Sequence, residues 1–177
     1  MRYGGLPRST VRSLCALIAA LGFGRAHATV FVRIPTERMV AMADTIVLAQ
    51  VAATQSRWDH GRIVTRVALT VEFSIKGVPG HTLVVEAPGG KVGDIAMRVL
   101  DGPEFRAGER AIVFLTRSRP GDVHRVLNLS QGKLAVVRDT SRGDLVTWVP
   151  PGTGWVETTP LAQVVTTLRA LARRDVR

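Results

Sequence analysis

The sequence has 177 residues, with 24 Lys and Arg against 14 Asp and Glu, one Cys, and 46% apolar residues. This length suits a single domain, and the apolar content is that of a globular chain rather than of a disordered one. A single Cys excludes a disulfide scaffold and a zinc site built from several cysteines. The 5% of aromatic residues argue against a broad base-stacking surface.

Residues 1–28 have the layout of a secretory signal peptide. Four arginines and no acid accompany an apolar run from Leu14 to Phe23, and the small residues of Ala26-His27-Ala28 form a cleavage site. A membrane anchor is the alternative, but the run is about half of the ~20 residues that span a bilayer. We therefore expect cleavage before Thr29, export to the periplasm or the medium, and no membrane span in the mature chain. Cleavage removes Cys15 and four basic residues, so 20 basic against 14 acidic residues leave a charge of +6.

The first part of the mature chain predicts a short helix and then two strands. Thr36 can cap a helix over residues 36–43, and the apolar, β-branched run Thr45–Val51 is typical of a buried strand. A turn at Asp59-His60-Gly61 follows. From Ile63 to Ile75 apolar residues of one parity alternate with polar ones, which is the period of a long strand with one dry face. The alternation predicts that the following residues point into a barrel: Val67, Leu69, Val71, Phe73 and Ile75.

Further strands and a final helix are predicted along the rest of the chain. Short β-type runs separated by Gly- and Pro-rich breaks occupy residues 81–86, 92–99, 111–115, 123–129, 134–137 and 145–149. The run at 111–115 is apolar on both faces and is therefore expected at the centre of the sheet. From Leu161 onward apolar residues follow helical spacing. We expect a β-barrel domain over residues 29–149, and a linker with a C-terminal helix packed on the barrel over residues 150–177.

Motifs that carry chemistry are largely missing from the sequence. Gly89-Gly90-Lys91 lacks the spacing of a phosphate-binding loop and is better explained as a turn or bulge. Ser130 is not in a nucleophile elbow, and its surroundings read as a turn between strands. Glu72 and Glu86 are explained as polar residues on the outward faces of strands, although their side chains could approach each other across neighbouring strands. The mature histidines stand on separate segments without metal-ligand spacing, and they are His60, His81 and His124. We expect no catalytic residue, cofactor, metal site or nucleic-acid partner.

The most suggestive surface cluster is the hairpin tip formed by Arg57, Trp58, Asp59 and His60. An exposed Trp beside charged residues combines apolar area with charge, which suits a contact with a partner. The alternative is that Trp58 folds back onto the end of the barrel.

The strand pattern resembles that of netrin-like domains, the group that includes tissue inhibitors of metalloproteases, and of uncharacterised exported bacterial proteins built on the same plan. The resemblance is carried by Ala43–Val51, Val67–Gly77 and Phe105–Leu115, within a span of about residues 43–133. It implies a mainly β fold, an OB-like closed or partly open antiparallel barrel with a short N-terminal helix and a C-terminal amphipathic helix. It transfers no inhibitory residue, because those inhibitors chelate the protease zinc through an N-terminal Cys, whereas Thr29 is the expected first residue here.

Three functions remain open at this point. The leading one is an exported, non-catalytic binding module for a protein or a cell-envelope component. The others are a hydrolase with a dispersed site and a binder of an anionic envelope polymer that acts through its arginines. A pocket that joins a histidine to two carboxylates would favour the hydrolase, and a continuous arginine stripe would favour the polymer binder. An apolar patch rimmed by Trp58 would favour a protein partner, and the oligomeric state is left open.

Overall fold

The computed structural model describes residues 34–117, 123–148 and 156–175. The expected signal peptide and the first part of the expected linker, with Trp155, lie outside the described residues. Residues 157–160, which were expected to lead into the final helix, form a strand instead. Strands make up 55% and helices 20% of the described part, so the expectation of a mainly β fold is confirmed. A short helix, α2 (Thr36–Met42), precedes the strands, and a longer one, α3 (Leu161–Asp175), ends the fold.

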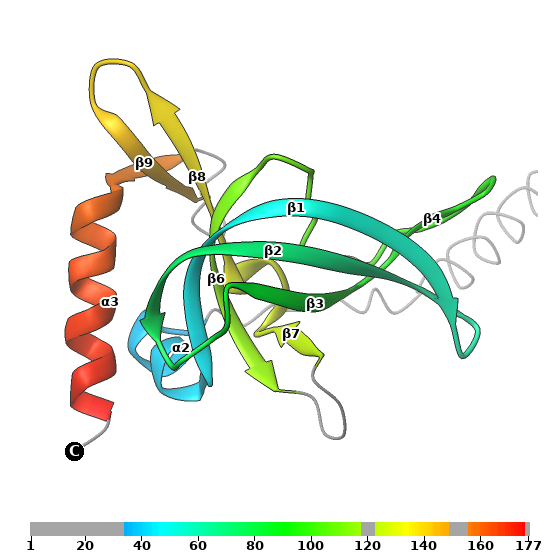
Figure 1. The fold of residues 1–177 in the computed structure, drawn as a ribbon, viewed down its shortest axis with the longest axis horizontal. Helices are drawn as coiled ribbons and strands as arrows, with labels where there is room; N and C mark the ends of the chain where they lie inside the picture. Colours follow the sequence, from blue (N-terminus) through cyan, green and yellow to red (C-terminus); the bar gives the residue numbers. More distant parts are fainter. Residues whose placement is uncertain (1–33, 118–122, 149–155, 176–177) are drawn as a thin grey trace, which may run out of the picture. The chain divides into compact units, whose positions relative to one another are not determined.

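Five strands close into a ring (Figure 1), which confirms the predicted barrel. The strands are β1 (Thr45–Asp59), β2 (Arg62–Lys76), β3 (Thr82–Pro88), β7 (His124–Val126) and β6 (Arg110–Arg117). They pair in this order, and β6 closes the ring by pairing with β1. Four of the five pairings are antiparallel, and β3 with β7 is parallel. The sequence analysis predicted a wholly antiparallel barrel, so the parallel pairing of β3 with β7 was not expected.

The remaining strands branch from the ring. The second edge of β6 is shared between β7 and β8 (Lys133–Asp139), and β9 (Gly143–Trp148) and β10 (Glu157–Pro160) extend the sheet beyond β8. A separate hairpin of β4 (Gly90–Val92) and β5 (Ile95–Met97) replaces the single strand predicted over 92–99. Its turn falls at Gly93, whose φ of +58° favours glycine.

The strand predicted over residues 123–129 is shorter than expected. Asn128 and Leu129 both have positive φ values, near 51° and 54°, which end the extended conformation after β7. The 3-10 helix η1 (Leu129–Gly132) takes the chain to β8. Gly132 is required there, because a Cβ at this position would lie 2.0 Å from the backbone oxygen of Leu127.

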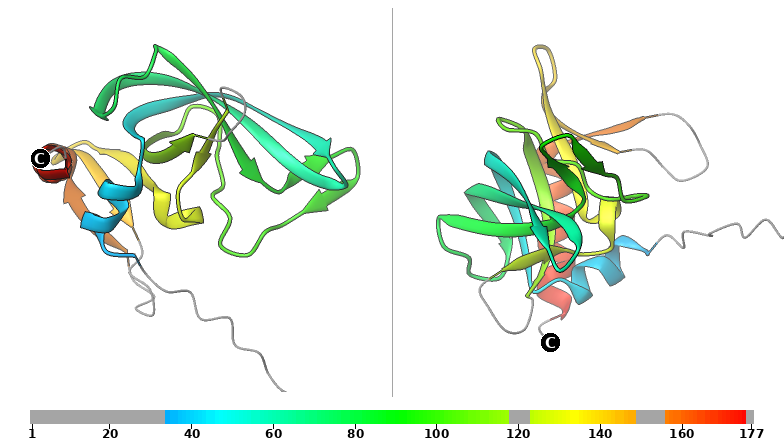
Figure 2. Two further views of the ribbon diagram at one scale, coloured as in Figure 1. Left: turned by 90° about the horizontal axis from the view of Figure 1, so that it is seen from below. Right: turned by 90° about the vertical axis from the view of Figure 1, so that its right-hand side faces the viewer.

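Two apolar clusters lie on opposite faces of β1 and β6. Inside the ring, one cluster takes residues from all five strands; its fully buried members include Val47, Val67, Leu69, Val85 and Val113. The other fills the space between the outer face of β1 and β6 and the two helices; its members include Leu48, Ile112, Phe114, Val165 and Leu168. Burial on both faces explains the continuous apolar runs predicted at 45–51 and 111–115. Figures 1 and 2 show α3 at the end of the fold opposite the β1–β2 turn.

One part of the predicted register is wrong. Val67, Leu69 and Val71 contribute to the cluster inside the ring as expected, but Phe73 and Ile75 belong to the cluster under the helices. The β1–β2 pairing shifts between Leu48 and Ala49, where Leu48 pairs with Phe73 and Ala49 pairs with Val71. A bulge at this point leaves one residue of β2 without a direct partner and sends the residues beyond it to the other face.

Candidate functional site

The predicted hairpin tip is the turn that joins β1 to β2. Asp59 pairs with Arg62, and His60 and Gly61 between them have positive φ values of 45° and 77°. Two left-handed residues make the turn that best matches the twist of a β-hairpin. The turn expected at Asp59-His60-Gly61 is therefore confirmed, and it presents the His60 side chain to solvent.

The tip residues do not present one common surface. Trp58 pairs directly with Ile63, so these two side chains share a face of the hairpin. Arg57 points to the opposite face, because successive side chains of a strand alternate. Trp58 is 47% exposed while Ile63 is 1% exposed, so Trp58 keeps about half of its surface in contact with solvent.

Arg57 is held by two carboxylates. Its Nη2 atom lies 3.4 Å from Oε2 of Glu86 on β3, and its Nη1 atom lies 3.6 Å from Oδ1 of Asp59. The same Asp59 oxygen lies 3.4 Å from Nδ1 of His60. Arg57 and Asp59 thus form an ion pair that His60 adjoins, whereas Trp58 stands apart on the other face.

An arginine cluster surrounds Glu86 on the outer face of the barrel. The strand pairings place Arg66, Glu86 and Arg125 in one row across β2, β3 and β7. Arg66 Nε lies 3.9 Å from the Glu86 Oε2 atom that also contacts Arg57. We call Arg57, Arg66 and Arg125 together with Glu86 the arginine face. Because Arg57 also contacts Asp59, the three guanidinium groups are opposed by two carboxylates, and these five side chains together carry a net charge of +1.

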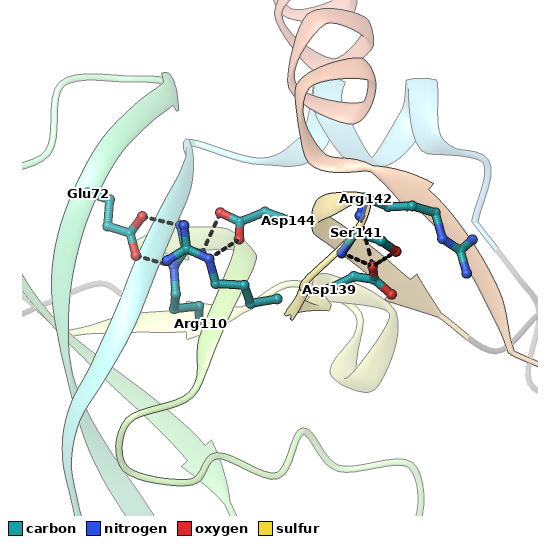
Figure 3. Close-up of polar contacts among 7 residues, drawn as sticks. Glu72, Arg110, Asp139, Ser141, Arg142 and Asp144 are labelled. Atoms are coloured by element: carbon teal, nitrogen blue, oxygen red, sulfur yellow. Dashed lines mark hydrogen bonds and ion pairs between the residues drawn. The ribbon is translucent and has the colours of Figure 1, made fainter.

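A second arginine joins three strands by short ion pairs (Figure 3). Arg110, at the start of β6, makes two parallel 2.7 Å hydrogen bonds to Glu72 of β2 and a third 2.7 Å bond to Asp144 of β9. The hydrogen bonds that Arg110 donates to Glu72 and Asp144 raise the pKa of Arg110 above its ordinary value, and the bond that Asp144 accepts lowers the pKa of Asp144. All three side chains are mostly covered, and their charges satisfy one another. This arrangement ties the β8–β9 hairpin to the barrel and leaves no reactive group free.

The β8–β9 turn carries the other polar contacts of Figure 3. Asp139 accepts hydrogen bonds from the Ser141 hydroxyl and from the backbone N–H groups of Ser141 and Arg142. These bonds, with the Ser141 hydroxyl first, lower the pKa of Asp139 to about 2. An aspartate that accepts backbone bonds two and three residues ahead is a turn-forming device, so this group stabilises the hairpin.

A hollow of about 360 Å³ lies beside η1 and is lined by residues that include Ser130, Lys133, Glu104 and Trp148. The Ser130 hydroxyl donates to the carboxylate of Asp101, and Lys133 pairs with Glu109 and bonds the Glu104 carbonyl. Ser130 therefore faces an acceptor that holds it in place, with no histidine among the lining residues. Within the described ranges, no group of three His, Cys, Asp or Glu side chains is arranged to hold a metal ion.

The glycine pair after β3 has a structural explanation. Gly90 has a φ of 137°, and a Cβ on it would lie 2.3 Å from the hydroxyl oxygens of Ser56 and Thr65. Thr65 donates to the Gly89 carbonyl at 2.7 Å, and the N–H of Lys91 donates to Ser56 at 3.3 Å. The pair lets β4 pass closely over the β1–β2 hairpin.

Sequence reasoning singled out Arg57 but missed the other residues that build the arginine face. Glu86 was interpreted as an outward polar position, and Arg66 and Arg125 were not singled out. Their alignment depends on the parallel β3–β7 pair, which no local pattern reports. Glu72 and Glu86, which could have met each other, contact different arginines instead.

Comparison of the sequence with protein-family models found no match, and comparison with curated proteins found none either. None of the helices in the described part of the chain is both long and apolar enough to cross a bilayer.

Proposed function

We propose that this chain is an exported, non-catalytic interaction module that contacts a protein or cell-envelope partner through Trp58 at the end of the β1–β2 hairpin. The observation that carries the proposal is the 47% exposure of Trp58 on a well-formed strand, directly opposite the buried Ile63. Aromatic side chains held rigidly at a surface contribute more to interfaces than other residue types, since little conformational entropy is lost when they are covered.

The position of Trp58 is fixed by its surroundings. The turn at His60 and Gly61 closes the hairpin, and the N–H of Gly89, the residue after β3, donates to the Ile63 carbonyl at 2.8 Å and supports the same end. A partner would therefore meet an indole whose backbone is already ordered. The proposal of export rests on residues 1–28. We propose that the resemblance to netrin-like domains concerns the order of the strands and does not include the inhibitory function.

The test is capture of partners by the mature chain and by a Trp58→Ala variant. The mature chain is immobilised, incubated with envelope and medium fractions of the producing cells, and the affinity of the recovered partner is then measured. A Trp at the centre of a contact contributes about 2 kcal/mol or more, so the variant should bind about 30-fold more weakly.

Val78→Ala is the matched control, because Val78 is an almost fully exposed apolar residue outside the tip. It should bind like the parent chain, and both variants should keep the parent melting temperature. Equal affinity of the Trp58→Ala variant and the parent would remove the tip from the contact surface.

A further inference from the structure

We propose that the arginine face binds a linear polymer bearing phosphate groups, independently of Trp58. The site is built by four strands, since Arg57 lies on β1, Arg66 on β2, Glu86 on β3 and Arg125 on β7. Guanidinium groups present a planar fork of donors that matches the oxygens of a phosphate group, which makes arginine the preferred residue for this anion.

The depths of the side chains show how the face can take an anion. Glu86 is 12% exposed, whereas Arg57 and Arg66 are 40% and 48% exposed. The carboxylate thus lies beneath the guanidinium groups, where it holds two of them in place through one oxygen. Both arginines keep close to half of their side-chain surface in contact with solvent, although the Nε atom of Arg57 is buried. Glu86 acts as a positioning residue for the cations above it.

Arg125 supplies the cation that Glu86 does not neutralise. It is exposed and stands opposite Glu86 in the row, and within the described residues it takes part in no ion pair. Two strand spacings separate Arg66 from Arg125, which is about 10 Å between their backbones. The face therefore offers separated cationic positions on either side of β3.

This spacing favours a polymer over a single small anion. An isolated phosphate that bridged Arg66 and Arg125 would lie over the carboxylate of Glu86, whose charge opposes it. A chain with several phosphate groups can place one group on each arginine and pass over Glu86 between them. Repeated contacts along a chain also release counterions, which gives strong binding at low salt and a steep loss of affinity as salt rises.

The face is distinct from the surface proposed for a protein partner. Arg57 and Trp58 occupy opposite sides of the hairpin, so loss of the indole leaves every member of the arginine face in place. The two proposals can thus fail separately.

The experiment measures binding of the full mature chain to long-chain inorganic polyphosphate by calorimetry at two salt concentrations. The variant Arg66→Gln/Arg125→Gln removes two charges from the face, and Arg173→Gln/Arg174→Gln removes two charges from the exposed end of α3. Figure 1 and the left view of Figure 2 place α3 at the end of the fold away from the β1–β2 turn. Both variants have the same net charge, so a difference between them reports the site.

We expect the Arg66→Gln/Arg125→Gln variant to lose about tenfold in affinity at low salt and to show a weaker salt dependence. The α3 variant and Trp58→Ala should bind polyphosphate like the parent, and inorganic phosphate at matched phosphate concentration should not compete. Equal losses in the two double variants would show an effect of net charge alone and overturn the proposal. Full competition by inorganic phosphate, or tighter binding of a single-stranded nucleic acid or of polyglutamate than of polyphosphate, would overturn the choice of ligand.

Discussion

Replacing Leu168 with Ala tests whether α3 covers the outer face of the barrel. Leu168 is 1% exposed and belongs to the cluster that joins α3 to β1 and β6. The substitution removes about three carbon groups, each worth about 0.8 kcal/mol on burial. The cavity left behind adds about 1 kcal/mol, since the surrounding sheet relaxes only in part. We therefore expect the free energy of unfolding to fall by about 3 kcal/mol.

Urea unfolding of the mature chain, followed by tryptophan fluorescence and by circular dichroism, measures this loss. Leu100→Ala is the control, because Leu100 is mostly exposed and the same atoms are removed from solvent-facing surface. It should change the free energy of unfolding by less than about 0.5 kcal/mol. If Leu168→Ala were as mild as Leu100→Ala, α3 would not pack on the barrel as described, and the account of the second cluster would be wrong.

Two further predictions concern the Arg110 ion pairs and the start of the mature chain. Because Arg110 lowers the pKa of Asp144 below its ordinary 3.8, the stability from this pair is present above about pH 4 and is lost as the pH falls through the folded-state pKa. Arg110→Met should thus lower the melting temperature at pH 7 and have a smaller effect near pH 2.5; a difference that stays constant between these pH values would contradict this reasoning. Cleavage after Ala28 predicts that N-terminal sequencing of the exported protein begins at Thr29, and a product that retains residues 14–23 would indicate an anchor instead.

Much of the fold could be predicted because its strands carry strong local patterns. The alternation between Ile63 and Ile75 marks β2 almost to its ends, and the doubly apolar runs identify β1 and β6 as central. The alternation could not show that Phe73 and Ile75 leave the barrel interior. A bulge is a property of two strands together, and the parity of one sequence does not record it.

The candidate sites were harder to predict, since tertiary pairing assembles them. Arg110 meets partners 38 and 34 residues away along the chain, so no motif spacing could have linked them. At the hairpin tip, by contrast, residues that are neighbours in sequence are separated in space. Arg57 and Trp58 are adjacent in sequence, but strand geometry separates them onto two faces, which the period of two already implied.

The closure of the ring by β1 and β6 has a consequence for how the chain reaches its folded form. β1 can form its hairpin with β2 at once, but the partner for its other edge begins only at Arg110. Until β6 is available, the apolar stretch 45–51 presents an unpaired edge with both faces uncovered. Such an edge is a template for pairing with other chains, and closing a distant pair is slow. We therefore expect nascent or refolding chains to be most prone to aggregate before β6 has paired with β1. A chaperone would have its largest effect at this stage.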